Sequence, residues 1–136
     1  HQSGLTPHQD ANAKALDALR VKFAEMVKRS DDAGARARIR LAIIDAFSSA
    51  MARERDNGIR MSAIGMGVGD AVADIVSSFV VTVASTSSTE MKIEGVERIL
   101  ATARGRAFDA VTNWDDLSAN EVTGVRYDIT PPVRAD

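Results

Sequence analysis

The sequence predicts an all-α protein, an antiparallel up-down-up-down four-helix bundle with an irregular C-terminal extension. Alanine is the commonest residue, at 22 of 136 positions, and the three prolines, Pro7, Pro131 and Pro132, stand near the two ends. This leaves a long interior without proline, in a composition that favours helices. Four apolar-periodic stretches follow one another with short links, which make consecutive helices antiparallel neighbours. We therefore expect a bundle over residues 1–113 and an extension, acting as a tail or arm, over residues 114–136.

The first helix is expected to begin at Thr6. Thr6 and Gln9 have the spacing of a capping box, and Pro7 stands at the first helical position, where its missing N–H is not needed. Apolar residues then repeat on one face, namely Leu16, Leu19, Phe23 and Met26, with Val27 beside them. Lys28 and Arg29 suit the C-terminal end of a helix, so we expect this helix to end there.

The second helix is expected to run from a cap at Asp31 or Asp32 to Asn57 and Gly58, because glycine adopts the left-handed conformation that ends helices. Its expected core positions are Ile39, Ile43, Ala46, Phe47 and Ala50. Leu41, Ile44 and Met51 widen the apolar arc beyond one stripe. This helix is therefore predicted to be central and to contact more than one neighbour.

The third stretch, residues 59–85, carries β-branched residues that would also suit a buried strand. A two-residue period fails over residues 75–83, whereas a helical period gathers the bulky apolar side chains in one broad arc. These side chains are Ile64, Val68, Val72, Ile75, Val76, Phe79 and Val83, and those opposite them are Asp70, Asp74, Ser77, Ser78 and Ser85. We predict a helix whose glycine-rich opening, residues 65–69, is bent or frayed.

No membrane span is expected in this stretch. Its longest runs without charge, residues 61–69 and 75–89, are shorter than the ~18 apolar residues that a span needs. The carboxylates of Asp70 and Asp74 lie near its middle, where lipid would make them costly.

The fourth helix is expected to open at a capping-box pattern, Ser87 to Glu90, and to fade near Asn113. Its apolar face is Val96, Leu100, Ala103, Ala107 and Val111. The chain's only tryptophan and tyrosine, Trp114 and Tyr127, follow in the extension. Large aromatic side chains seldom stay fully solvated without a binding role, so we expect the extension to dock on its own bundle or on a neighbouring chain.

Composition excludes several kinds of chemistry. A formal charge of −2 gives no overall attraction to nucleic acid or to acidic membranes. The absence of cysteine excludes disulfides, thiolate nucleophiles, iron–sulfur clusters and cysteine-type zinc sites. The first residues lack the basic start and apolar run of a secretory signal, so a cytoplasmic location is expected.

Two charged groups are weighed as candidate sites. Asp70 and Asp74 share a helical face and could hold a cation or act as an acid and base, but no Glu-x-x-His motif accompanies them. Arg36 and Arg40 also share a face and could contact phosphate, yet Arg38 points about 160° away from Arg40. A strand would align all three arginines, but the alanine-rich context favours a helix. We interpret both groups as solvated surface.

The small residues Gly65, Gly69, Ala73 and Ser77, spaced four apart, predict a strip on which another helix can approach closely. The glycines do not form a phosphate loop, because neither Gly-x-Gly-x-x-Gly nor the Lys-Ser/Thr pair of a P-loop is present. The strip is therefore interpreted as a packing surface, together with Trp114 and Tyr127.

These observations lead to one functional expectation and two alternatives. We expect a non-enzymatic helical interaction or self-assembly protein, without catalytic residues, metal or cofactor, whose partner is itself, as a dimer or larger closed assembly, or another protein. The first alternative is a nucleic-acid-associated regulator that uses the basic second helix. The second is a metal binder or carboxylate enzyme centred on Asp70 and Asp74.

Overall fold

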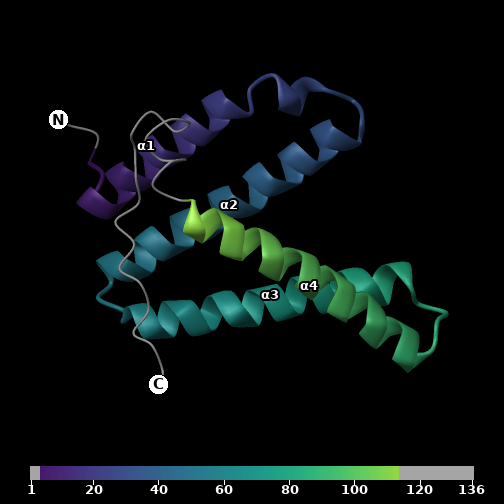
Figure 1. Ribbon diagram of the computed structural model, residues 1–136. Helices are drawn as coiled ribbons and strands as arrows, with labels where there is room; N and C mark the ends of the chain where they lie inside the picture. Colours follow the sequence, from purple (N-terminus) through teal and green to yellow (C-terminus); the bar gives the residue numbers. More distant parts are fainter. Residues whose placement is uncertain (1–3, 114–136) are drawn as a thin grey trace. The chain divides into compact units, whose positions relative to one another are not determined.

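A computed structural model describes residues 4–113, and the prediction that Trp114 and Tyr127 dock lies outside these residues. The described residues form four α-helices, a short 3-10 helix and no strand (Figure 1), which confirms the all-α class. They fall into two compact units that meet between Ile64 and Gly65, and each unit is described by itself. The antiparallel arrangement of all four helices stays a prediction.

Helix α1 (Pro7–Lys22) begins at the predicted capping box. The Gln9 amide donates to Thr6 Oγ1 at 3.1 Å, and the Thr6 amide donates to Gln9 Oε1 at 3.2 Å. The predicted C-terminus is wrong, because α1 ends at Lys22 and a 3-10 helix, η1 (Met26–Lys28), follows. The Ala24 amide donates to the Val21 carbonyl three residues back, at 3.3 Å, so the ladder of bonds between residues four apart breaks there. Beyond this end, Arg38 Nη1 donates to the carbonyl oxygens of Val27 and Arg29, at 2.8 and 2.7 Å, and satisfies two carbonyls of the link to α2.

Helix α2 (Asp32–Asp56) starts and stops where the sequence predicts. Of the two candidate caps, Asp31 is the one used, and its Oδ1 accepts a hydrogen bond from the Gly34 amide at 3.1 Å. Asn57 is the C-cap, and Gly58 follows with a φ of 79°, in the left-handed region. The helix boundaries therefore follow from local residue chemistry.

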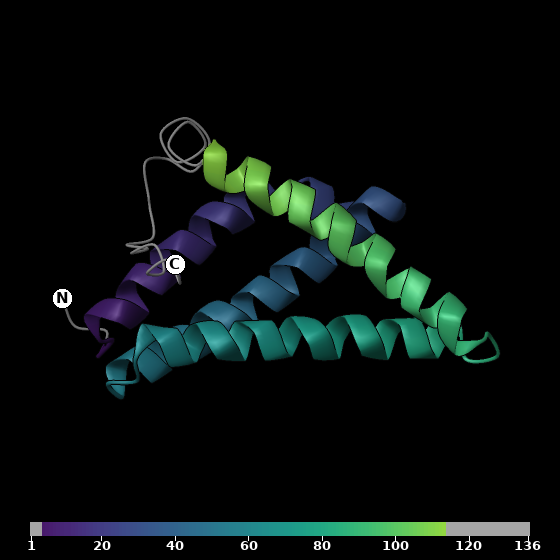
Figure 2. The same ribbon diagram turned by 60° about the horizontal axis from the view of Figure 1, so that its bottom comes forward.

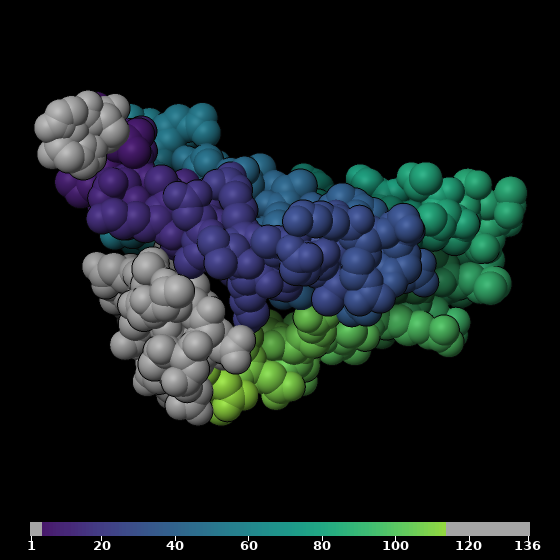
Figure 3. Space-filling model, turned by 90° about the horizontal axis from the view of Figure 1, so that it is seen from above, coloured from purple at the N-terminus to yellow at the C-terminus, as the bar shows by residue number. Residues whose placement is uncertain are grey.

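Helices α1 and α2 form an antiparallel hairpin, in which the space-filling view of Figure 3 shows them side by side. Polar contacts fix its register: Thr6 Oγ1 donates to Asp56 Oδ2 at 2.7 Å, and Arg20 Nη2 lies 2.9 Å from Asp45 Oδ2. The side chains or backbones buried in this unit belong to Ala15 and Leu16 of α1 and to Gly34, Ala37, Ser48 and Ala52 of α2. Small residues on α2 thus let the two helices approach closely.

The predicted core positions of α2 are wrong for this hairpin. Ile39 is 59% exposed, and Ile43, Ala46, Phe47 and Ala50 are exposed as well. Close approach of α1 favours the small-residue face of α2, and the bulky face lies about 180° away around the helix. Of the predicted apolar face of the first helix, Leu16 is buried and Leu19 and Phe23 are half-buried, as is the neighbouring Val27, whereas Met26 is exposed.

Helix α3 (Met61–Val83) confirms the helical interpretation of the third stretch. The expected bend or fraying at residues 65–69 is absent, and Figure 2 shows an uninterrupted ribbon through the glycines. Helix α4 (Thr89–Thr112) ends at the predicted Asn113 cap. Its N-cap is Ser88, whose Oγ accepts from the Met91 amide at 3.2 Å, so the predicted capping box of Ser87 with Glu90 is off by one residue.

Candidate interaction surfaces

Helix α2 presents two faces of opposite character. One face is buried through small residues against α1 and η1, and the other carries bulky apolar side chains that are exposed. We call the second set the α2 outer face, and it consists of Ile39, Ile43, Ala46, Phe47 and Ala50. The prediction of an apolar arc wider than one neighbour can cover is consistent with this division, but the face that α1 covers is the less bulky one.

Helix α3 carries a second exposed apolar row, which we call the α3 stripe: Val68, Val72, Ile75, Phe79 and Val83. The spacings of four, three, four and four residues place these side chains on one side of the helix. Phe79 is 56% exposed, although phenylalanine is among the residues most often buried in soluble proteins. Among residues 65–113, the stripe is therefore left uncovered.

Helix α4 covers only a flank of α3. Val76 and Val80 are the buried residues of α3, and a Cβ atom built on Gly95 of α4 would lie 3.5 Å from Val80 Cγ1. Val80 lies about 100° around the helix from Phe79. Within α4 itself no residue is buried, and of its predicted apolar face Leu100, Ala103, Ala107 and Val111 are exposed.

The predicted small-residue strip spirals around α3 instead of forming a straight track. Gly65, Gly69, Ala73 and Ser77 are all exposed, and each step of four residues turns the strip by about 40°. Gly65 and Gly69 face open space, since a Cβ atom at either position would meet nothing within 4 Å. Only the first glycines of the strip lie beside the α3 stripe.

The basic cluster of α2 is largely engaged in local structure. Arg29 pairs with Asp31, Arg38 binds the two backbone carbonyls that end η1, and the Arg40 guanidinium lies 4.9 Å from the centre of the Phe23 ring. The hydrogen bond from Arg29 lowers the pKa of the Asp31 carboxyl, and the bond from the Gly34 amide adds to this effect. Arg36 is exposed on the outward side of the same helix. The cluster therefore does not present a row of available cations.

Asp70 and Asp74 are both exposed on α3. Among residues 4–113, no group of three or more His, Asp or Glu side chains is placed to hold a metal ion. The residues that line a pocket belong to α1 and α2.

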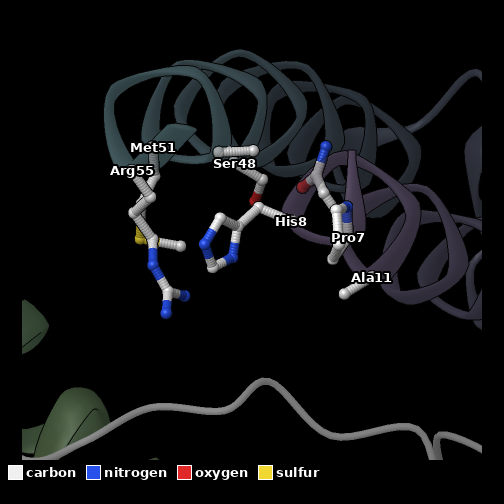
Figure 4. A pocket seen from close by; sticks show the side chains of 8 residues that line it. Pro7, His8, Ala11, Ser48, Met51 and Arg55 are labelled. Atoms are coloured by element: carbon white, nitrogen blue, oxygen red, sulfur yellow. The ribbon is translucent and has the colours of Figure 1, made fainter. Parts of the chain in front are cut away.

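A shallow hollow of about 210 Å³ lies at the end of the hairpin where α1 begins. Its lining residues are Pro7, His8, Ala11 and Asn12 of α1 with Ser48, Met51, Ala52 and Arg55 of α2. Figure 4 shows His8 and Arg55 projecting from the two helices toward the same space. Asn12 Oδ1 is buried there without a hydrogen-bond partner. Among residues 4–113, no carboxylate lines the hollow.

Sequence reasoning missed two features. The buried small-residue face of α2 was visible as Gly34, Ala37, Ser48 and Ala52, which lie on one side at helical spacing. The role of Arg38 had no local signal, because its carbonyl partners lie nine and eleven residues earlier in the chain.

By length and composition, α3 is also long and apolar enough to cross a membrane, with a mean hydropathy of 1.6 over its most apolar window and 11% of that window buried.

Comparisons of the sequence with protein-family models and with characterised proteins, and of the fold with solved structures, find no match. Function must therefore be argued from these surfaces.

Proposed function

We propose that this chain is a non-enzymatic helical protein that assembles with copies of itself through the α2 outer face and the α3 stripe. The observation that carries the proposal is the outward orientation of the bulky residues of α2. Ile39, Ile43 and Phe47 are exposed, whereas the buried residues of the same helix are alanine, glycine and serine. Packing on α1 therefore leaves a second apolar face of α2 uncovered within the hairpin.

The α2 outer face and the α3 stripe leave a large apolar area in contact with water. Full burial of an isoleucine or phenylalanine side chain contributes about 1.5–3 kcal/mol relative to exposure. The two surfaces hold eight large apolar side chains, leaving aside the alanines of the α2 outer face. Contiguous exposed apolar surface on this scale is typical of interaction sites.

A second copy of the chain is the occupant that the chemistry favours. Both surfaces are rows of uncharged aliphatic and aromatic side chains, so each complements another surface of its own kind. A bilayer fits α3 less well, because Asp70 and Asp74 lie at the middle of the helix and would lose their water. Nucleic acid fits α2 less well, because Arg38 and Arg29 are held by partners in their own chain.

The experiment compares two equally exposed apolar residues on α3. Phe79 lies in the α3 stripe and Val81 lies about 160° away around the helix, and each is 56% exposed. We expect Phe79→Glu to shift the mass measured by light scattering toward the monomer, while Val81→Glu leaves it unchanged. Equal effects of both substitutions would contradict a specific interface.

Two further results would overturn the proposal. If the wild-type chain is monomeric at micromolar concentration, the apolar surfaces are covered within one chain. If it co-sediments with phosphatidylcholine vesicles and loses its assembly there, the partner of α3 is lipid.

A further inference from the structure

The hollow between the beginning of α1 and the end of α2 is a feature that the proposed self-assembly does not use. We propose that it binds a small aromatic carboxylate, whose ring lies on the apolar walls and whose oxygens accept hydrogen bonds from Arg55 and His8. This proposal does not depend on the assembly, because the lining residues belong to α1 and α2 and none of them is part of the α2 outer face.

Two short rows of side chains build the hollow, one on each helix of the hairpin. The rows are Pro7, His8, Ala11 and Asn12 on α1, and Ser48, Met51, Ala52 and Arg55 on α2. Spacings of three and four residues keep each row on one side of its helix. The two alanines have only a methyl group, so the helices leave a space there that longer side chains would fill. The position of the lining side chains is therefore set by two helices of one compact unit.

The size and the walls of the hollow decide which apolar group fits. Its volume of about 210 Å³ exceeds the roughly 150 Å³ of an engineered protein cavity that holds benzene. Pro7, Ala11, Met51 and Ala52 supply apolar wall, and the thioether of a methionine makes favourable contacts with aromatic rings. A single six-membered ring therefore fits the hollow in size and in character.

Two hydrogen-bond donors are available for an anion. Figure 4 shows His8 and Arg55 projecting toward the same space, and both residues are half-buried. Among residues 4–113, neither side chain is paired with a carboxylate. Asp56, the neighbour of Arg55 in the sequence, accepts a hydrogen bond from Thr6 Oγ1 at 2.7 Å and does not line the hollow. An anion in the hollow therefore meets two donors that no lining carboxylate occupies.

The donors and the walls together select the class of anion. A guanidinium offers parallel N–H groups that match the two oxygens of a carboxylate, and an imidazole N–H can add a third bond. Inorganic phosphate would lose water against the walls beside Pro7 and Met51 without gaining hydrogen bonds there. An aromatic carboxylate satisfies both parts of the hollow. The same chemistry occurs in a free acid and at the end of a peptide whose last residue is aromatic.

Titration of the isotope-labelled full chain with benzoate, followed by nuclear magnetic resonance, tests the site. A ligand of about nine non-hydrogen atoms should bind with a dissociation constant of about 1 mM. We expect the amide signals of the residues that line the hollow to shift. Benzyl alcohol, which lacks the charge, and acetate, which lacks the ring, should each bind at least about tenfold more weakly. Equal affinities for the three probes, or shifts confined to other residues, would overturn the proposal.

A pair of arginine variants separates a specific site from general charge attraction. Arg55→Gln removes the guanidinium, and we expect it to weaken benzoate binding by about tenfold. Arg53→Gln is the matched control, because Arg53 is exposed, lies outside the hollow and points about 160° away around the same helix. It should leave the affinity unchanged. Equal weakening by the two substitutions would show that benzoate responds only to net charge, and would overturn the site.

A variant that fills the hollow tests the ring. Ala11 is exposed at the edge of the space, so Ala11→Leu adds a side chain there without disturbing a buried residue, and it should also weaken binding by about tenfold. Unchanged binding would place the ring elsewhere and contradict the proposal. Circular dichroism of each variant checks that its helices are intact.

N-acetylphenylalanine distinguishes the two sources of the ligand, because it joins the same ring and carboxylate to a peptide-like backbone. Tighter binding than that of benzoate would assign the hollow to the end of a peptide, and weaker binding would assign it to a free acid. A wild-type chain that binds neither probe at about 10 mM would overturn the proposal.

Discussion

The α1–α2 hairpin and the α3–α4 pair use their apolar residues differently. The hairpin buries small side chains and is fixed by long-range polar contacts, from Arg20 to Asp45 and from Thr6 to Asp56. In residues 61–113, which contain α3 and α4, the structure has no ion pair, and Val76 and Val80 are the only buried residues. The hairpin thus buries one face of α2 and leaves the α2 outer face exposed, whereas α3 and α4 leave nearly all of their large apolar side chains exposed.

The largest expected difference between the two regions concerns leucine. Leu16 is 4% exposed inside the hairpin, so Leu16→Ala should lower the free energy of unfolding by about 3 kcal/mol through lost burial and a cavity. Leu100 of α4 is exposed, and Leu100→Ala should cost less than about 1 kcal/mol. Urea denaturation followed by circular dichroism measures both. Similar losses of unfolding free energy in the two variants would contradict the difference between the two regions.

Glycine gives the second comparison. A Cβ atom on Gly34 of α2 would overlap the carbonyl oxygen of Arg29, which belongs to the backbone and cannot rotate away. We expect Gly34→Ala to destabilise the hairpin by about 1–3 kcal/mol. Gly105 of α4 faces open space, so Gly105→Ala should stabilise its helix by about 0.5–1 kcal/mol. Thermal melts of the two variants should therefore shift in opposite directions, and a stabilised Gly34→Ala variant would show that α2 starts differently.

Arginine gives a smaller effect. Arg38→Met removes the two hydrogen bonds to the carbonyls of Val27 and Arg29, and we expect a loss of about 1 kcal/mol. Arg36→Met, on the same helix but without these bonds, should stay within about 0.5 kcal/mol of the wild-type chain.

The arginines of α2 also test the alternative that the protein binds nucleic acid. Binding of duplex DNA that survives moderate salt and disappears when Arg36 and Arg40 become alanine would favour that alternative over self-assembly.

The smallest expected effect is the response of the hairpin to pH. The hydrogen bond from Arg29, followed by that from Gly34, lowers the pKa of Asp31 in the folded chain. Because the folded pKa is below the unfolded one, this stabilisation is present above the unfolded pKa of about 3.9 and is lost as pH falls through the folded value. Asp31→Asn keeps a capping side chain but cannot titrate. Its melting temperature should fall less than that of the wild-type chain below about pH 4, and equal slopes would show that Asp31 does not contribute.

The helices of this protein could be predicted because their ends depend on neighbouring residues. Thr6 with Gln9, Asp31 with Gly34, and Gly58 act within a few positions of the chain, so the sequence contains the whole interaction. The link after α1 could not be predicted in the same way. Two of its carbonyls bind Arg38, which reaches back from the next helix.

The sequence also could not predict which face of α2 lies against α1, because this depends on a contact between residues far apart in the chain. Hydrophobicity ranks Ile39, Ile43 and Phe47 above alanine and serine, so the bulky face was expected in the core. Close packing depends instead on the distance at which two particular helices meet, and the small buried residues Ser48 and Ala52 permit a shorter distance. The candidate surface was predicted as an excess of apolar residues on α2, but its position followed only from knowing which face α1 covers.

The mass of the wild-type chain in solution tests the central claim most directly. If the α2 outer face and the α3 stripe are sites of self-assembly, sedimentation equilibrium at micromolar concentration should give twice the 14.5 kDa of one chain, or a larger whole multiple. On dilution the mass should fall toward that of one chain. A mass of 14.5 kDa at every concentration would contradict the account, because the exposed rows of isoleucine, valine and phenylalanine would then be covered without a second copy.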